Sequence, residues 1–282
     1  MKRKKIAVVG VGLIGGSMAI QLHEKKLSSG LIGVDASAAH AQQALEMELV
    51  DEVLPLEQAI AASDVVILAV PVDQLVQQLP AILDLVKDQI VIDLGSTKSQ
   101  LVEAVKDHPR RGRYVATHPM WGTEYSGPAA AMRGAFEKKA VIICNASDSD
   151  ADALEWTRAM FEKIGMRILE MGAAAHDLHA AYVSHISHIT SFALANTVLQ
   201  KEKEDNAIFE LASAGFESTV RLAKSNPAMW VPIFLQNKEN VLDVLKEHIA
   251  QLQRFKESIE QDDDRYLLKL IEDANKIRRI IK

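Results

Sequence analysis

The pattern of hydrophobic and polar positions changes once along the chain, near residue 172. Before that point, short unbroken apolar runs alternate with segments of helical spacing, and after it only helical spacing appears. Unbroken apolar runs of this length are typical of strands buried in a sheet that is covered on both faces. The pattern therefore predicts an α/β domain over residues 1–171, followed by an all-helical domain over residues 172–282.

The apolar runs of the first part are predicted strands, with helical patterns between most of them. They cover residues 5–9, 31–35, 63–71, 88–99, 113–119, 140–145 and 166–171. Strand ends at Pro71, Ser96 and His118 are expected at the carboxyl edge of the sheet. Open α/β sheets bind their ligands at that edge.

The second part is predicted to contain four helices. They cover residues 173–201, 205–223, a long stretch that starts at Pro227 and is kinked early by Pro232, and 263–281, which the acidic run 262–264 begins. Helices this apolar bury more than one face. We therefore expect this part to join two copies of the chain, with packing inside one chain as the alternative.

Glycines follow the first predicted strand in the pattern G-x-G-x-x-G, at Gly10, Gly12 and Gly15, and a helical pattern comes next. Such glycines form a tight turn, admit a pyrophosphate and pack helix against strand, while the helix N-terminus offers free N–H groups. Asp35 ends the second strand, 20 residues after Gly15, where a carboxylate binds a ribose diol and repels a 2′-phosphate. A Rossmann-type domain that binds NAD is predicted, and a glycine-rich turn without a ligand is the alternative.

Composition and charge narrow the function further. The chain has 282 residues, a formal net charge of −6 and a single cysteine, and it contains no run of 18 apolar residues. An acidic chain argues against nucleic acid, and the missing apolar span argues against a membrane segment. The basic N-terminus is followed by a stretch that glycines interrupt, unlike a signal peptide. We expect a soluble cytoplasmic protein whose partners are a small-molecule substrate and a second copy of itself.

Histidines concentrate in the helical part, with His176, His179, His185 and His188 inside 13 residues. His185 and His188 share one helix face. A metal site is one interpretation, but no carboxylate or cysteine completes an evident ligand set, and we expect no metal. The other interpretation is a polar helix face in an active-site cleft, where histidine donates a hydrogen bond or carries a proton.

Two more polar features stand out. The loop THPMWGTEYSGP, residues 117–128, begins where a predicted strand ends at the ligand-binding edge. Arg221 lies among apolar neighbours, where a guanidinium requires a carboxylate that it can grip with two hydrogen bonds. That carboxylate is either an internal glutamate or part of a substrate.

These features occur together in an order that resembles the prephenate dehydrogenase family, whose relatives include arogenate dehydrogenases. The matching stretches are G-x-G-x-x-G with Asp35, DLGSTKS, HPMWGTEYSGP, VSHISH and STVR…NPAMW, and they span essentially the whole chain. The resemblance implies NAD-dependent oxidative decarboxylation of prephenate to 4-hydroxyphenylpyruvate, a step of tyrosine biosynthesis. It also implies an active site in the cleft between a dinucleotide-binding domain and a helical dimerisation domain. We expect neither the ACT domain nor the fused chorismate mutase that some relatives carry.

The resemblance assigns catalytic roles to three residues. His118 corresponds to the histidine that takes the proton of the substrate 4-hydroxyl, and Ser96 to the serine that orients this hydroxyl and the nicotinamide. His188 corresponds to a histidine near the substrate, and His185 lies beside it as support.

Binding roles follow in the same way. Arg221 matches the arginine that binds a substrate carboxylate, Thr123 and Glu124 match residues that line and gate the pocket, and Asp177 matches a position of polar support. The expected cofactor-binding residues are Gly10, Gly12, Leu13, Ile14, Gly15, Asp35, Val70, Pro71 and Ser96.

The chain departs from the family pattern at two loop positions. Trp121 stands where many relatives have a small residue, and Tyr125 where many have a lysine. The indole either narrows the pocket or packs the loop, so the choice between prephenate and arogenate stays open. An imine reductase or β-hydroxyacid dehydrogenase of the same architecture and a non-catalytic nucleotide sensor are further alternatives. His118, Ser96 and Arg221 argue against them.

Overall fold

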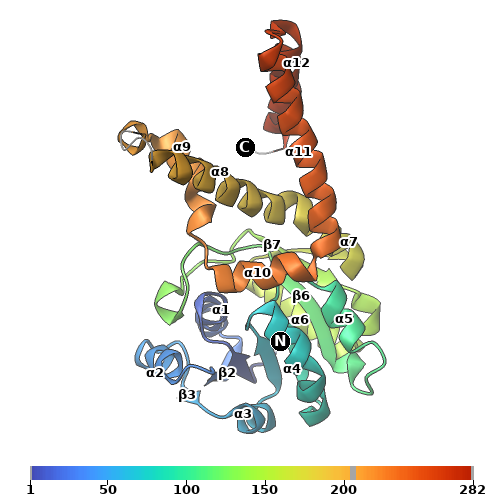
Figure 1. The fold of residues 1–282 in the computed structure, drawn as a ribbon. Helices are drawn as coiled ribbons and strands as arrows, with labels where there is room; N and C mark the ends of the chain where they lie inside the picture. Colours follow the sequence, from blue (N-terminus) through green and yellow to red (C-terminus); the bar gives the residue numbers. More distant parts are fainter. Residues whose placement is uncertain (1, 204–207, 281–282) are drawn as a thin grey trace. The chain divides into compact units, whose positions relative to one another are not determined.

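In the computed structural model, residues 2–203 and 208–280 are described, and the chain forms two compact units, residues 1–237 and 238–282. The first unit contains an eight-stranded sheet in the order β3-β2-β1-β4-β5-β6-β7-β8 (Figure 1). Its strands are β1 (Lys4–Val9), β2 (Ser28–Val34), β3 (Glu52–Val53), β4 (Val65–Leu68), β5 (Ile90–Asp93), β6 (Tyr114–Pro119), β7 (Ala140–Cys144) and β8 (Arg167–Met171).

Every strand predicted from the apolar runs is present, and the two-residue β3 is an addition. The neighbouring strands run parallel, except that β6 and β7 are antiparallel. Parallel strands need a long crossover, whereas residues 120–139 turn back at the edge where β6 ends. Consequently the start of β7 lies at the carboxyl edge, beside the end of β6.

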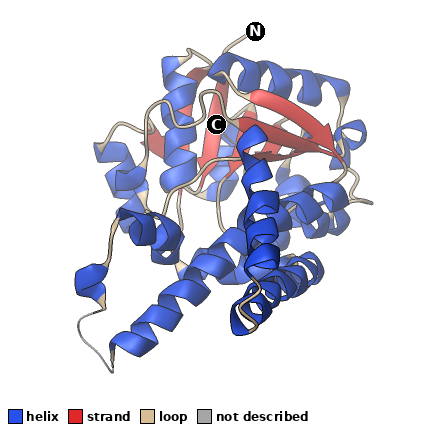
Figure 2. Cartoon of the chain, turned by 90° about the horizontal axis from the view of Figure 1, so that it is seen from above, coloured by secondary structure: helices blue, strands red, loops and turns tan. Residues whose placement is uncertain are grey.

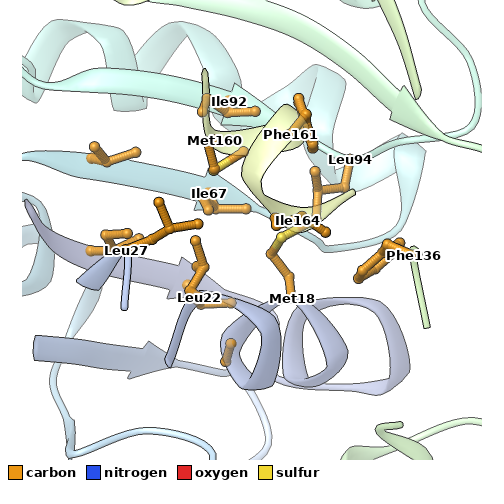
Figure 3. Packing of buried hydrophobic residues seen from close by; sticks show 14 of the residues in the cluster. Met18, Leu22, Leu27, Ile67, Ile92, Leu94, Phe136, Met160, Phe161 and Ile164 are labelled. Atoms are coloured by element: carbon orange, nitrogen blue, oxygen red, sulfur yellow. The ribbon is translucent and has the colours of Figure 1, made fainter. Parts of the chain in front are cut away.

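Helices cover both faces of the sheet, as Figure 2 shows and as the unbroken apolar strands predicted. One face is covered by α1 (Leu13–Glu24) and α6 (Ala151–Ile164). Met18, Leu22, Met160 and Phe161 pack there against the strands (Figure 3). The other face is covered by α3 (Leu56–Ala62), α4 (Val72–Leu85) and α5 (Ser99–Ala104), and α2 (Ala38–Glu46) connects β2 to β3.

The first predicted helix of the second part is confirmed. It consists of α7 (Ala173–Ala180), a π-helical turn over Ala181–His185 and α8 (Ile186–Glu202). The π turn adds one residue to a helical turn and re-aims the side chains around it, a device common at functional sites.

The predicted helix 205–223 is wrong in most of its length, and its residues 205–207 lie outside the described part of the chain. The described remainder forms a 3₁₀ turn over Phe209–Leu211, α9 (Ala214–Val220) and a second 3₁₀ turn over Arg221–Lys224. The Ser218 and Thr219 hydroxyls both donate to the carbonyl of Gly215. Serine, threonine and glycine favour such local alternatives over a long helix.

The predicted long helix from Pro227 is two helices, α10 (Pro227–Gln236) and α11 (Lys238–Glu260). The interruption falls at Asn237 instead of Pro232. The Asn237 amide donates to the carbonyl of Asp177 at 2.6 Å and lies 3.2 Å from Nδ1 of His185. These tertiary hydrogen bonds hold Asn237 outside helical geometry.

The second unit consists of α11 packed against α12 (Asp264–Asn275). The Asp263 carboxylate accepts a hydrogen bond from the Tyr266 N–H at 2.9 Å, so the acidic run begins this helix as predicted. Across residues 2–203 and 208–280, no helix is long and apolar enough to cross a membrane.

Candidate active site

A cavity of about 570 Å³ opens at the carboxyl ends of β1, β4, β5 and β6 and reaches the π turn, α8 and α10. Most of the sequence-predicted site residues line it, namely Gly12, Leu13, Ile14, Val70, Pro71, Ser96, His118, Thr123 and His188. The other predicted residues are not among those that line it, namely Gly10, Gly15, Asp35, Glu124, His185 and Arg221.

The glycine turn has the geometry that a dinucleotide needs. Gly10 has a φ of +90°, and a Cβ atom there would lie 2.6 Å from the carbonyl oxygen of Ala69. A Cβ at Gly15 would lie 1.8 Å from the carbonyl oxygen of Gly10, so the third glycine is required for the close approach of helix and turn. Gly12 has no such neighbour, because the nearest atoms to its Cβ position belong to Gly127 at 4.0 Å.

Helix α1 begins at Leu13, and its N-cap, Gly12, provides no side chain to bond the first N–H groups. Free N–H groups and the positive end of the helix dipole attract phosphate. The turn therefore fits the diphosphate of NAD.

Asp35 stands at the end of β2, as predicted. Its carboxylate accepts hydrogen bonds from the Val11 N–H at 3.1 Å and the Ser37 N–H at 2.9 Å. Nδ1 of His40 lies 3.8 Å from the same carboxylate. These bonds tie the carboxylate to the glycine turn, where a ribose diol of the cofactor can donate to it.

The catalytic candidate His118 is the first member of a buried chain of hydrogen bonds. Its Nδ1 lies 2.8 Å from Nε2 of His176, and Nδ1 of His176 lies 2.8 Å from Oδ1 of Asp177. The Asp177 carboxylate also accepts from the Lys98 and Ser99 N–H groups, each at 2.8 Å. Sequence reasoning placed His176 in the histidine cluster and did not connect it with His118, because 58 residues separate the two.

The chain of hydrogen bonds determines which ring nitrogen of His118 carries a proton. A carboxylate only accepts, so His176 donates from Nδ1 and leaves its Nε2 as an acceptor. His118 must then donate from Nδ1, and its Nε2 carries the free lone pair. The arrangement makes Nε2 of His118 the atom that can receive a proton.

Electrostatics support the same assignment. Burial lowers the pKa of His118 well below its ordinary value of 6.5, and the neighbouring His176 and Lys98 lower it further. Burial alone would raise the pKa of Asp177, but hydrogen bonds from His176 and Ser99 hold it below its usual range. The result is a neutral His118 imidazole that His176 connects to an ionised carboxylate, and this arrangement suits proton acceptance near pH 7.

Behind His118 lies a buried ion pair that the sequence did not reveal. The Lys98 ammonium contacts Asp93, and both side chains are fully buried. Asp93 also accepts from the Tyr114 hydroxyl at 2.8 Å, the Thr117 N–H at 3.1 Å and the Gly95 N–H at 2.9 Å. The pair thereby fixes the end of β5, the turn that contains Ser96 and the backbone next to His118.

On the helical side, His188 stacks on Trp230. The two ring centroids are 3.4 Å apart at an interplanar angle of 27°, and Nδ1 of His188 lies 3.1 Å from the carbonyl of Ser184. Burial lowers the pKa of His188, so this imidazole is neutral too. Trp230 also lines the cavity, and its buried indole N–H has no partner among the described residues. The motif NPAMW contained this donor without showing its orientation.

His185 supports this wall from behind. Burial lowers its pKa to about 4, and its ring packs edge-on against Trp230 and Phe234 with centroids 6.0 and 6.4 Å away. Its contact with Asn237 connects the π turn to the end of α10. His185 therefore acts on packing and lies outside the cavity.

Arg221 forms an ion pair with an internal glutamate. Its Nη1 lies 2.9 Å from Oε2 of Glu124, and the Arg221 side chain is half exposed. Thr123, the neighbour of Glu124, lines the cavity. The pair thus connects the loop after β6 to the turn after α9, next to the cavity.

The two loop residues that depart from the family pattern, Trp121 and Tyr125, lie in different surroundings. Trp121 packs edge-on against Phe136, with ring centroids 5.3 Å apart, and also lines the cavity, so it packs the loop and narrows the pocket at once. Tyr125 is 68% exposed at the rim of the cavity.

Within the described ranges, no group of three or more histidine, cysteine, aspartate or glutamate side chains could hold a metal ion.

Comparison with known proteins agrees with this geometry. Residues 18–170 match the family profile "Prephenate dehydrogenase, nucleotide-binding domain", and residues 172–273 match "Prephenate dehydrogenase, dimerization domain". A prephenate dehydrogenase of Bacillus subtilis is 30% identical, over 97% of this chain and 75% of that protein. A cyclohexadienyl dehydrogenase of Zymomonas mobilis is 32% identical, over 99% of this chain and 96% of that protein.

Solved structures are similar along the whole chain. The prephenate dehydrogenase of Aquifex aeolicus, in complex with hydroxyphenyl propionate and NAD⁺, has a TM-score of 0.89 at 28% identity, covering 100% of this chain and 99% of that one. The arogenate dehydrogenase of Synechocystis has a TM-score of 0.78 at 26% identity, covering 99% of this chain and 100% of that one.

Proposed function

Because the chain belongs to the prephenate dehydrogenase family, we propose that its cavity oxidises prephenate with His118 as the proton acceptor. The enzyme is an NAD-dependent oxidoreductase that converts prephenate into 4-hydroxyphenylpyruvate and CO₂. The observation that carries the proposed role of His118 is the buried chain His118–His176–Asp177 at the wall of a cavity that also contains the glycine turn.

The proton transfer follows from the positions of these groups. NAD⁺ held at the glycine turn would supply the acceptor for the hydride that leaves C4 of the ring. As C4 becomes a carbonyl carbon, its hydroxyl proton passes to Nε2 of His118, which the chain of hydrogen bonds keeps unprotonated. Asp177 stabilises the positive charge that His118 and His176 then share. Loss of the ring carboxylate as CO₂ leaves a phenolate, which takes the proton back from His118.

The other residues hold the reactants in place. Ser96 is at the cavity wall, and its hydroxyl has no hydrogen-bond partner among the described residues, so it can orient the 4-hydroxyl. His188 and Thr123 contact the substrate from the helical wall and the loop, with His185 as support behind His188. Arg221 binds a substrate carboxylate once Glu124 releases it, and Glu124 gates the pocket by holding or releasing Arg221. Asp35 binds the adenosine ribose and selects NAD over NADP.

A homodimer formed through the helical part is also proposed, with residues 172–282 as the helical substrate and dimerisation domain and residues 1–171 as the dinucleotide-binding domain. In α8, Ser191 is the one buried residue, and the rest of this apolar helix is half-buried or exposed in a single chain. Leu242, Ile249, Leu252 and Ile259 of α11 are each more than half exposed. Because the chain has a single, buried cysteine and its substrate is a biosynthetic intermediate, we place the enzyme in the cytoplasm.

A steady-state assay of NADH absorbance tests the proposed function. Purified protein is offered NAD⁺ or NADP⁺ with prephenate or L-arogenate in turn. Turnover of prephenate with NAD⁺ is expected. A preference for arogenate would retain the mechanism and shift the substrate, with Trp121 and Tyr125 as the first positions to examine. Protein that binds NAD⁺ and turns over neither compound would refute the proposal.

A further inference from the structure

The charge of the cavity wall is concentrated in a residue that the mechanism does not use. Lys139 lines the cavity, and it is the one lysine or arginine among the described residues that does so. No described aspartate or glutamate lines the cavity, and the histidines there are neutral. An anion that enters this space therefore meets Lys139 as its fixed cation.

The strand register shows which side of the sheet Lys139 faces. It directly precedes β7, where Val141 and Ile143 pack on the face covered by α1 and α6, while Ile142 and Cys144 pack on the other face. Side chains alternate along a strand, so Lys139 shares the face of Val141.

His118 lies on the opposite face. It pairs with Ile142 across the antiparallel ladder, and residues directly opposite each other point the same way. His118 and Lys139 therefore line the cavity from opposite faces of the sheet.

The cavity that Lys139 lines also contains the glycine turn, at Gly12, Leu13 and Ile14. The Met120 N–H donates to the carbonyl of Ala140 at 2.8 Å, which holds the loop after β6 next to Lys139. The far end of that loop reaches the glycine turn, because Gly127 lies 4.0 Å from the Cβ position of Gly12. Lys139 is exposed and forms no ion pair with a described carboxylate, so its ammonium is available.

We propose that Lys139 is a cofactor-binding residue whose ammonium pairs with the diphosphate of NAD, across the cavity from the N-terminus of α1. The two phosphates are the anionic groups of this cofactor. The helix provides N–H groups on one side of them, and Lys139 provides a full charge on the other. The inference rests on the NAD cofactor and is independent of the substrate assignment.

The test compares Lys139→Met with Lys138→Met in the full-length protein. Lys138 is exposed, adjacent in sequence and outside the cavity wall, so it controls for the loss of one charge. Titration calorimetry with NAD⁺, ADP-ribose and adenosine gives the dissociation constants. We expect Lys139→Met to weaken NAD⁺ and ADP-ribose about tenfold and leave adenosine unchanged. Lys138→Met should change each constant less than about twofold.

Two results would overturn the inference. If both variants weakened NAD⁺ binding equally, the loss would come from the overall charge of the protein and not from a contact made by Lys139. Unchanged NAD⁺ and ADP-ribose affinity would remove Lys139 from the cofactor site, and if KM for prephenate rose at the same time, Lys139 would belong to the substrate. Failure of the proposed function looks different, because it appears as wild-type protein that binds NAD⁺ without turning over prephenate.

Discussion

The two sides of the cavity are built in different ways. On the sheet side, His118 lies in a buried network in which Asp93 and Asp177 each accept several hydrogen bonds. On the helical side, a half-exposed arginine is held by a single hydrogen bond to Glu124. The first arrangement fixes the base before the substrate arrives, whereas the second can exchange an internal carboxylate for one of the substrate.

The largest effect is expected from removing the base itself. His118→Asn should lower kcat by about 10²–10⁴, because the hydroxyl proton then loses its general base. KM for prephenate should change little. Steady-state kinetics checks this, with the exposed His23→Asn as the matched control. A His118→Asn enzyme that retained wild-type kcat would remove His118 from the mechanism.

The next effect is expected from breaking the buried Lys98–Asp93 ion pair, and it concerns the free energy of unfolding instead of the reaction rate. Lys98→Met leaves the Asp93 carboxylate buried without its cation, which should lower the free energy of unfolding by about 3–5 kcal/mol. The double variant Lys98→Met/Asp93→Asn should regain much of that loss, because neither charge remains. Urea denaturation measures both, with the exposed Lys106→Met as control. A double variant less stable than Lys98→Met alone would contradict the explanation.

Asp177→Asn tests whether the chain of hydrogen bonds sets the tautomer of His118. An amide can donate to His176 and reverse the direction of the chain, so that Nε2 of His118 becomes protonated and cannot accept. We expect kcat to fall about 10²-fold while the thermal midpoint moves by only a few degrees. Should kcat stay within twofold of wild type, the chain would have no role in tautomer choice.

The pH dependence of kcat/KM reports the buried base directly. Burial holds the pKa of His118 well below 6.5, so the imidazole stays neutral as the pH falls through that value. The acid limb of the profile should therefore lie below pH 6.5, and protonation at lower pH should abolish acceptance. An acid limb at or above pH 6.5 would mean that the site is hydrated or that another group titrates.

The smallest effect is expected from changing the Arg221–Glu124 ion pair on the helical side of the cavity. Arg221→Lys keeps the charge but loses the planar fork, so KM for prephenate should rise up to about tenfold with kcat nearly unchanged. Glu124→Gln, which frees Arg221, should leave KM equal or lower. Arg158→Lys, in another exposed pair with a glutamate, is the control. An unchanged KM for Arg221→Lys would contradict the bidentate grip.

Local patterns in the chain identified much of the candidate site. The spacing of Gly10, Gly12 and Gly15 after a strand predicted the dinucleotide turn, because a Cβ atom at Gly10 or Gly15 would clash with nearby backbone and Gly12 leaves space beside the turn. The strand ends at Pro71, Ser96 and His118 meet at one edge because parallel strands share a direction, and all three line the cavity.

Several contacts of the candidate site could not be predicted from the sequence. Nothing in the sequence indicates that His176 bonds His118, 58 residues away, or that the nearby Lys98 and Asp93 form a buried ion pair. Trp230 was part of a motif without a role. The long helix predicted from Pro227 is interrupted at Asn237, because the Asn237 amide has tertiary hydrogen-bond partners in Asp177 and His185.

The sequence by itself determined the periodicity of each element, the glycine turn and the kinds of chemical group at the strand ends, since these depend on neighbours along the chain. Only the tertiary structure decided which ring nitrogen of His118 is free, which carboxylate holds Arg221 and which face Lys139 addresses. Those properties depend on distances and burial between residues that lie far apart along the chain, and folding alone brings them together.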